Sequence, residues 1–359
     1  MDWIGPAAGL GASVGWLLTS LFFTAAGRRL GPTAVNALRL VLAVILLGSA
    51  HAIMFGSVWP AALAPRELFM LALSGFIGLA IGDQLLYTAF VDIGPRLTLL
   101  LMTTTPIFAA VFGVLALGAA EVPGVLEVVG MSVTIAGVAW VVAERPHTEE
   151  DDRPHPHRVR GIVFATLAAA CQAGGAMFSK LGMGHGSAEA ADVDPLAATY
   201  VRMVFATVVF VPIVLAMGAR RSAKIRAGAA LKPTNRTGSR GAGYWFTLLG
   251  AIAGPFFGVW MSLIAYDRAP LGVAQTLCGL APVLILPFSA WLYRERVTWR
   301  ASLGAIVAVG GATVLAFAEP ASDSQRALRE EAVSGAGAAA EPDASSSPSS
   351  RENVGTSTG

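Results

Sequence analysis

A carboxylate, an amide and a phenol lie close together inside an apolar stretch: Asp83, Gln84 and Tyr87 fall in the segment 68–90. On a helix, residues three or four apart share a face, so Tyr87 would lie beside both Asp83 and Gln84. An ionisable side chain inside a membrane helix is costly and is therefore a candidate functional group. Burial also favours the protonated form of a carboxylate, so Asp83 could carry a coupling proton as well as contact a solute. The alternative is that Asp83 lies near the membrane interface and only hydrogen-bonds Tyr87.

Other polar or aromatic side chains inside apolar segments are further candidates for contact with a solute. They are Trp16, Asn36, Gln172, Trp260 and Gln275. The amides of Gln172 and Gln275 could bind a solute directly. They could equally hold helices together, because side-chain amides form hydrogen bonds between membrane helices.

Three kinds of residue occur at matching places in the two halves of the chain, and we interpret them as gating or structural residues. The pairs are Arg39 with Arg202, Pro106 with Pro282, and Glu121 with Glu295. Each arginine could bind an anionic group, or could pin a helix end by reaching the interface. Each proline removes a backbone donor, so it could act as a hinge or be a tolerated kink. Each glutamate lies at the loop end of a helix, and the basic neighbours of Glu295 favour a surface ion pair.

The segments that carry these residues are long and apolar. Of the 359 residues, 55% are hydrophobic and only 13% are charged, whereas soluble domains average about 25% charged residues. A helix needs about 20 apolar residues to cross the hydrocarbon core. Ten segments qualify, near 7–26, 34–55, 68–90, 95–118, 124–143, 160–180, 197–217, 243–266, 271–293 and 302–318. We therefore predict an all-α integral membrane protein with about ten transmembrane helices.

An internal repeat relates the two halves. Gly78, Gly82 and Pro106 recur 176 residues later as Gly254, Gly258 and Pro282, and Glu121, Gly130 and Gly137 recur 174 residues later as Glu295, Gly304 and Gly311. The series predicts a first repeat at 1–143, a polar linker at 144–159, a second repeat at 160–319 and a disordered tail at 320–359. Because each repeat has five helices, the two must have opposite orientations in the membrane. An inverted repeat predicts a solute site near the midplane, between the halves.

Lysine and arginine residues gather in the loops on one side of the predicted bundle. The loops that follow segments one, three, five, seven and nine, together with the segment ends beside them, hold 17 of them, and the opposite loops and segment ends hold Arg66, Lys180 and Arg268. Loops rich in basic residues stay in the cytoplasm. The sequence therefore predicts a multi-pass protein of an inner or plasma membrane, with both termini outside.

The order of these motifs resembles the EamA-like family of the drug/metabolite transporter superfamily. In the first half the resemblance rests on Tyr87-Thr-Ala-Phe, Thr105-Pro106, Glu121, Gly130 and Gly137, and in the second on Ala265-Tyr-Asp-Arg, Ala281-Pro282, Glu295, Gly304 and Gly311. It covers roughly residues 7–318. The resemblance implies a ten-helix secondary transporter of a metabolite, an amino acid or a drug-like solute, often an exporter. A nucleotide-sugar or phosphate-ester exchanger of the same fold, or a membrane protein without transport activity, is the alternative.

Other function classes find little support. The five histidines are scattered along the chain, and the three at positions 147, 155 and 157 lie in the charged linker at irregular spacing. We therefore expect no metal site. The chain has no phosphate-binding Walker sequence and no GxSxG or HExxH motif, which argues against an ATP-driven pump and against an enzyme. We expect no cofactor and no nucleic-acid partner. The expected partners are a solute and the lipid bilayer, with protons as a candidate coupling ion, and a homodimer is left open.

Overall fold

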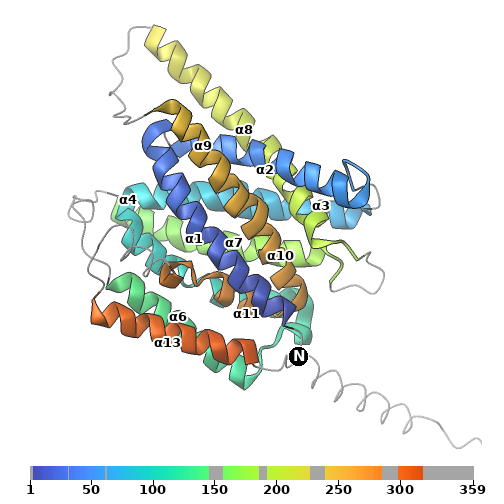
Figure 1. The fold of residues 1–359 in the computed structure, drawn as a ribbon, viewed down its shortest axis with the longest axis vertical. Coiled ribbons are helices and arrows are strands. Elements are labelled where there is room, and N and C mark those ends of the chain that lie inside the picture. The colour runs from blue at the N-terminus through green and yellow to red at the C-terminus, as the bar shows by residue number, and fades with distance from the viewer. Residues whose placement is uncertain are drawn as a thin grey trace, which may run out of the picture.

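The computed structural model describes residues 3–30, 32–60, 63–144, 157–185, 192–226, 239–284 and 298–317, and this part of the chain is helical and without strands (Figure 1). The first half contains α1 (Ile4–Leu30), α2 (Pro32–Phe55), α3 (Pro65–Ser74), η1 (Gly75–Gly82), α4 (Asp83–Met102), α5 (Thr105–Leu117), η2 (Gly118–Glu121) and α6 (Val125–Ala143). The second half contains α7 (Arg158–Gly182), α8 (Pro195–Arg226), α9 (Arg240–Ala251), η3 (Ile252–Gly258), α10 (Val259–Arg268), α11 (Leu271–Cys278) and α13 (Trp299–Phe317). Most of the predicted linker and all of the predicted tail lie outside the described residues.

Nine helical stretches in the described part are long and apolar enough to cross a membrane, and their ends agree with the predicted segments to within a few residues. The segment predicted at 271–293 is described as an apolar helix as far as Leu284. Large apolar side chains cover the outside of the bundle; Leu115 is 77% exposed and Ile306 68%. A surface of this kind needs lipid rather than water around it. The chain is therefore a multi-pass membrane protein of the predicted all-α class.

One predicted connection is helical. We expected residues 91–94 to separate the third and fourth segments, but α4 continues through them to Met102. Pro95 removes one backbone hydrogen bond, but membrane helices tolerate a proline in their interior. The interruption comes later, at Thr103 and Thr104, between α4 and α5.

The two halves share two irregularities at equivalent positions. Residues Gly75–Gly82 form a π-helix in the first half, and Ile252–Gly258 form one in the second, shifted by 176 residues at their last residue. The helix is also interrupted at 103–104 in the first half and at 279–280 in the second, again 176 residues apart. A regular α-helix contains neither a π-helical stretch nor an interruption, and π-helices often occur at functional sites. The shared irregularities support the internal repeat at the level of the backbone.

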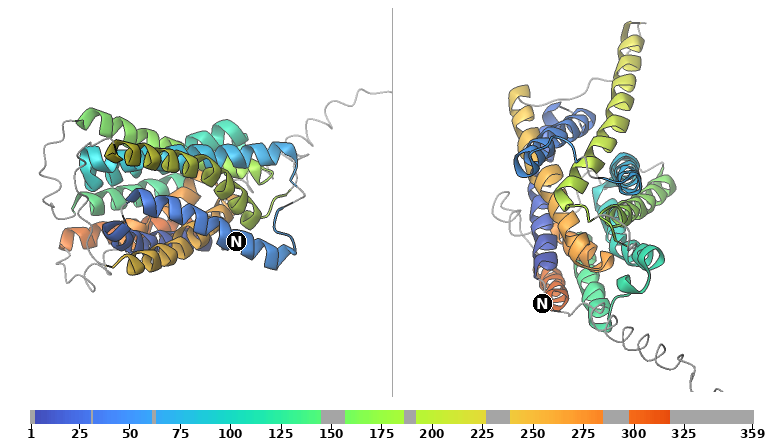
Figure 2. Two further views of the ribbon diagram at one scale, coloured as in Figure 1. Left: turned by 90° about the horizontal axis from the view of Figure 1, so that it is seen from above. Right: turned by 90° about the vertical axis from the view of Figure 1, so that its right-hand side faces the viewer.

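Each π-helix packs against a helix of the other half. In Figures 1 and 2, α1 runs beside α9 and α10, and its contacts extend to η3; in the same way α7 contacts η1. Backbone meets backbone at both places. A Cβ atom added to Gly15 of α1 would lie 2.9 Å from Cα of Gly258, and one added to Gly175 of α7 would lie 2.9 Å from Cα of Gly78. The GxxxG spacings at 78/82 and 254/258 thus serve close helix packing.

The last helices of the two halves, α6 and α13, form a second interface (Figure 1). Glycines of the repeat line it. A Cβ at Gly137 would lie 2.4 Å from the backbone nitrogen of Ala308, and one at Gly311 would lie 2.5 Å from the backbone nitrogen of Thr134. Such close approach leaves no room for a side chain on either helix.

We expect Gly311→Ala to destabilise the protein by about 1–3 kcal/mol, the usual effect of overpacking a tight interface. The neighbouring Gly310 is the matched control, because a Cβ there meets nothing within 4 Å. Thermal unfolding in detergent should show a lower midpoint for Gly311→Ala and no loss for Gly310→Ala. Equal midpoints in the two variants would contradict the packing of α6 against α13.

Candidate functional site

A central cavity of about 810 Å³ lies between the two halves. In the first half its lining comes from α1, α2, η1, α4, α5 and α6, and in the second from α7, α8, η3, α10 and α11. Most of the lining is apolar. The polar side chains that reach it include Arg39, Asp83, Gln172, Arg202 and Gln275. A volume of this size suits a small organic solute.

The cavity spans the middle of the bundle: its first-half lining lies toward one side and its second-half lining toward the other. Its first-half lining comes from the later part of α1 (Trp16 to Phe23), the early part of α2 (Arg39 and Leu40) and the later part of α6 (Thr134 to Val138). These helix ends carry the loops rich in lysine and arginine, so we call this end the basic side and the other end the opposite side. The interruptions of α4–α5 and α11 also line the cavity, through Thr103 and Gly279.

A buried network joins Asp83 to Arg39 and Gln172. The Arg39 guanidinium donates to one carboxylate oxygen of Asp83, and Nε2 of Gln172 donates to the other at 2.9 Å and to the carbonyl of Gly78 at 3.2 Å. Nε of Arg39 donates to Oδ1 of Asn36 at 2.6 Å. The side chains of Arg39 and Asp83 are only 8% and 10% exposed. The network therefore joins α2 and α4 of the first half to α7 of the second half within the membrane.

Arg202 occupies the equivalent place in the second half. Arg39 is the eighth residue of α2 and Arg202 the eighth of α8, each counted from an initial proline. Arg202 is 5% exposed and lines the cavity. Its backbone packs against η1, because a Cβ at Gly75 would lie 2.2 Å from the carbonyl oxygen of Arg202. The two arginines thus enter the cavity region from opposite sides of the membrane.

A second buried ion pair lies on the opposite side, beyond the end of the cavity. Nζ of Lys180 lies 2.5 Å from Oε1 of Glu121 and donates to the carbonyl of Ala269 at 2.7 Å. The backbone N–H of Leu271 donates to Oε2 of Glu121 at 2.6 Å. These contacts tie η2 of the first half to the end of α7 and to the connection between α10 and α11. None of these four residues lines the cavity.

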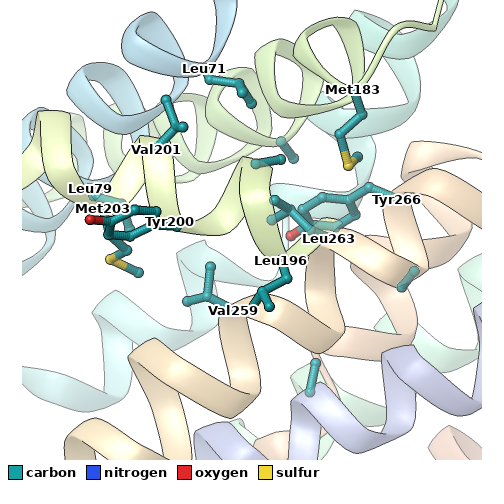
Figure 3. Packing of buried hydrophobic residues seen from close by; sticks show 14 of the residues in the cluster. Leu71, Leu79, Met183, Leu196, Tyr200, Val201, Met203, Val259, Leu263 and Tyr266 are labelled. Carbon is teal, nitrogen blue, oxygen red and sulfur yellow. The ribbon is translucent and has the colours of Figure 1, made fainter. Parts of the chain in front are cut away.

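The buried cluster shown in Figure 3 packs α8 and α10 together beside the cavity. Met203 of α8 and Val259 and Tyr266 of α10 belong both to this cluster and to the cavity lining. The cavity wall here is continuous with the hydrophobic core.

The first interruption uses its threonines to satisfy freed backbone carbonyls. The hydroxyls of Thr103, Thr104 and Thr105 donate to carbonyls three residues earlier, at 2.7, 2.6 and 2.7 Å. Pro106 follows in the first turn of α5, and Pro282 follows the second interruption; both line the cavity. Membrane helices tolerate such breaks where they line a cavity.

The other predicted site residues fall into three groups. Trp16 and Gln275 line the cavity, and Asn36 lies behind it against Arg39. The side chain of Gln84 is exposed, and neither Gln84 nor Trp260 lines the cavity; Trp260 stacks near Phe256, with ring centroids 6.0 Å apart. The side chain of Tyr87 and the whole of Glu295 lie outside the described part of the chain.

Sequence reasoning missed two features of the site. It placed Lys180 in a loop on the opposite side and did not identify its partner Glu121. It named Tyr87 as the neighbour of Asp83 and did not identify Arg39 and Gln172, which hold the carboxylate from other helices. Nothing in the spacing along one chain reveals such partners. Among the described residues, no group of three or more histidine, cysteine, aspartate or glutamate side chains could hold a metal ion.

Comparison with known proteins places this geometry in context. The EamA-like transporter family matches residues 3–143 and 159–317, one repeat in each half. A solved crystal structure superposes with a TM-score of 0.65 at 16% identity, and the alignment covers 87% of this chain and 98% of the other. At that identity the likeness concerns the fold alone. A search of curated proteins finds no match.

Proposed function

Because the chain belongs to the EamA-like transporter family and is thus a membrane transporter of the drug/metabolite type, we propose that it moves a small solute through the central cavity by alternating access of its two halves. The observation that carries this proposal is a central cavity lined by both halves, together with a buried contact that joins the halves on one side of it. The contact of Lys180 with Glu121 lies on the opposite side, and neither residue lines the cavity. Inverted repeats alternate between a state closed on one side and a state closed on the other by exchanging the shapes of their halves.

The interrupted helices supply a physical route for the exchange. Interruptions at 103–104 and at 279–280 occur at equivalent positions, and each faces the cavity. A helix without continuous backbone hydrogen bonds bends at lower cost than a regular one. We propose that Pro106 and Pro282 mark hinges, and that Arg39, Arg202 and Glu121 act in gating or solute contact, as Glu295 would from its repeat position.

We further propose export from the cytoplasm across an inner or plasma membrane, with the basic side in the cytoplasm and both termini outside. A state closed on the opposite side by the contact of Lys180 with Glu121 is the state that loads an exporter from the cytoplasm. Protons are the proposed coupling ion and Asp83 the proposed carrier, because it is an acidic residue buried in the cavity wall. A homodimer is compatible with this scheme, which needs only one chain for each cavity.

The alternative of a nucleotide-sugar or phosphate-ester exchanger finds less support. Such solutes carry at least two negative charges and need several free cations. Arg39 is paired with Asp83, and Lys180 is paired with Glu121 outside the cavity. Of Arg39, Lys180 and Arg202, only Arg202 has no carboxylate partner in the described part of the chain.

Reconstitution tests the proposed function. Purified protein in liposomes should give saturable counterflow of at least one labelled solute from a panel of amino acids, organic acids, organic cations and sugars. Gln275→Trp, which fills the cavity, should abolish that flux. The matched control is Leu115→Trp, because Leu115 is 77% exposed on the lipid-facing side of α5. Absence of flux for every solute, with and without an imposed pH gradient, would contradict transport.

A further inference from the structure

Arg202 brings a buried positive charge to the cavity, and no group in the described part of the chain pairs with it directly. Its side chain forms no hydrogen bond with the described residues, and its buried Nε has no partner. Within that part of the chain no carboxylate lies at ion-pair distance from it. The one carboxylate of the described cavity lining, that of Asp83, already binds Arg39 and Gln172. Arg202 therefore lacks the partner that Arg39 has.

The internal repeat explains the missing partner. Arg39 and Arg202 are counterparts, and the residue 176 positions after Asp83 is Val259. Val259 is 3% exposed and lines the cavity. The first half thus supplies an arginine with its carboxylate, whereas the second half supplies the arginine and a valine where the carboxylate would be.

The charge of the cavity follows from this asymmetry. The described side chains that line it include two guanidinium groups, those of Arg39 and Arg202, and one carboxylate, that of Asp83, so one guanidinium is left without a carboxylate. An unpaired ion taken out of water is strongly unfavourable. Most of the cavity lining is apolar and includes Leu79, Met203 and the aromatic Tyr266. A bound ligand with one negative charge and an apolar body would neutralise the guanidinium that lacks a carboxylate and would contact the apolar lining.

We propose that Arg202 binds the carboxylate of the transported solute, which takes the place of the acid that Val259 replaces. The solute class is an organic monocarboxylate with an apolar body. This proposal rests on the proposed function, because it names the solute group that the central cavity recognises. Arg202 is suited to this contact since a guanidinium can bind both oxygens of a carboxylate at once. A dicarboxylate would leave its second charge without a cation.

Four probes that share a 3-phenylpropyl skeleton, to which the dianion adds a second carboxylate, test whether the cavity prefers one negative charge. They are hydrocinnamate, its neutral amide, 3-phenylpropylamine and the dianion benzylmalonate. The measurements use the whole protein in detergent. Binding is measured by calorimetry and by the rise in unfolding temperature that a ligand of the native state produces. We expect hydrocinnamate to bind tightest. Tighter binding of the amide, the amine or benzylmalonate would overturn the proposal.

Two substitutions at the valine separate charge from shape. Val259→Asp restores the missing acid, so it should neutralise Arg202 and weaken hydrocinnamate binding about thirtyfold or more, the usual loss when a buried charge contact is removed. Val259→Asn has nearly the same shape without the charge and should retain binding. Arg202→Gln should lose binding and Arg202→Lys should keep part of it, while Arg300→Gln, exposed on α13, serves as the control.

The outcomes distinguish this proposal from the proposed function. If a cation or a sugar is transported and hydrocinnamate neither binds nor competes, transport is supported, but the proposed binding of a carboxylate by Arg202 is contradicted. If hydrocinnamate binds Val259→Asp as tightly as Val259→Asn, the anion does not use Arg202. If no solute of any class moves in liposomes, the transport function itself fails.

Discussion

Lys180→Gln is expected to open the opposite side of the cavity. In this structure Lys180 joins Glu121 of the first half to Ala269 of the second, and both charged side chains are less than 10% exposed. Removing one partner of a buried ion pair costs about 3–5 kcal/mol, because the other charge stays buried without compensation. That cost falls on the state in which the pair is formed. The equilibrium should therefore shift, by more than about a hundredfold, toward the state in which the opposite side is open.

Transport assays and thiol labelling measure this shift. Lys180→Gln should slow net transport, because the cycle must pass through the state that the variant disfavours. Arg268→Gln is the matched control: Arg268 lies on the same side, pairs with Asp267 at 3.0 Å and is 50% exposed. A surface pair of this kind contributes less than about 1 kcal/mol, so the control should behave as the unaltered protein. Equal behaviour of the two variants would show that the buried pair is not a gate.

Asp83→Asn is expected to have the second large effect. The substitution keeps the shape of the side chain but leaves Arg39 without its acid in a buried site, which should cost about 3–5 kcal/mol of stability. It also removes the one carboxylate of the described cavity lining. If protons drive transport through Asp83, the variant should lose accumulation driven by a pH gradient. Counterflow, which needs no net proton movement, should survive in the fraction that folds.

Asp92 provides the control for this experiment. It lies on the same helix, α4, and also binds an arginine, with both oxygens 2.7 Å from nitrogens of Arg160, but it lies between the membrane spans. The Arg160 guanidinium lowers the pKa of Asp92 below its usual value near 3.8. A lowered pKa means that this contact stabilises the fold above that pKa and is lost only in more acidic solution. Asp92→Asn should therefore leave the pH dependence of transport unchanged between mildly acidic and neutral pH. The same unchanged dependence in Asp83→Asn would exclude Asp83 as the proton carrier.

The helices and the repeat could be predicted from the sequence because they depend on patterns along the chain. Apolar length sets the membrane spans, and the 176-residue offset relates Pro106 to Pro282 in sequence and the two interruptions in structure. The π-helices at η1 and η3 were not predicted, since no residue pattern distinguishes them from α-helix. The glycines near them indicated close packing but not its partner, which is a helix of the other half in both cases.

The candidate site could be predicted only in part, because the residues that meet there lie far apart in the sequence. Asp83 was identified because an acid in an apolar segment is unusual. Its partners Arg39 and Gln172 come from positions 44 residues before and 89 residues after it, and such distances are set only by the folded bundle. Gln84 was grouped with Asp83 by helical spacing, but its side chain is exposed. A comparison of the two halves position by position says more about the site than helical spacing does, since it identifies Val259 as the counterpart of Asp83.

Accessibility of one cavity position from each side of the membrane tests alternating access most directly. Gln275→Cys places a thiol in the cavity lining, and Cys171→Ser with Cys278→Ser removes the native cysteines. In oriented vesicles, a membrane-impermeant maleimide should label position 275 from the basic side at rest. It should label the same position from the opposite side during turnover or when Lys180→Gln is added. Labelling from the basic side alone under every condition, or from both sides at once at full rate, would contradict alternating access.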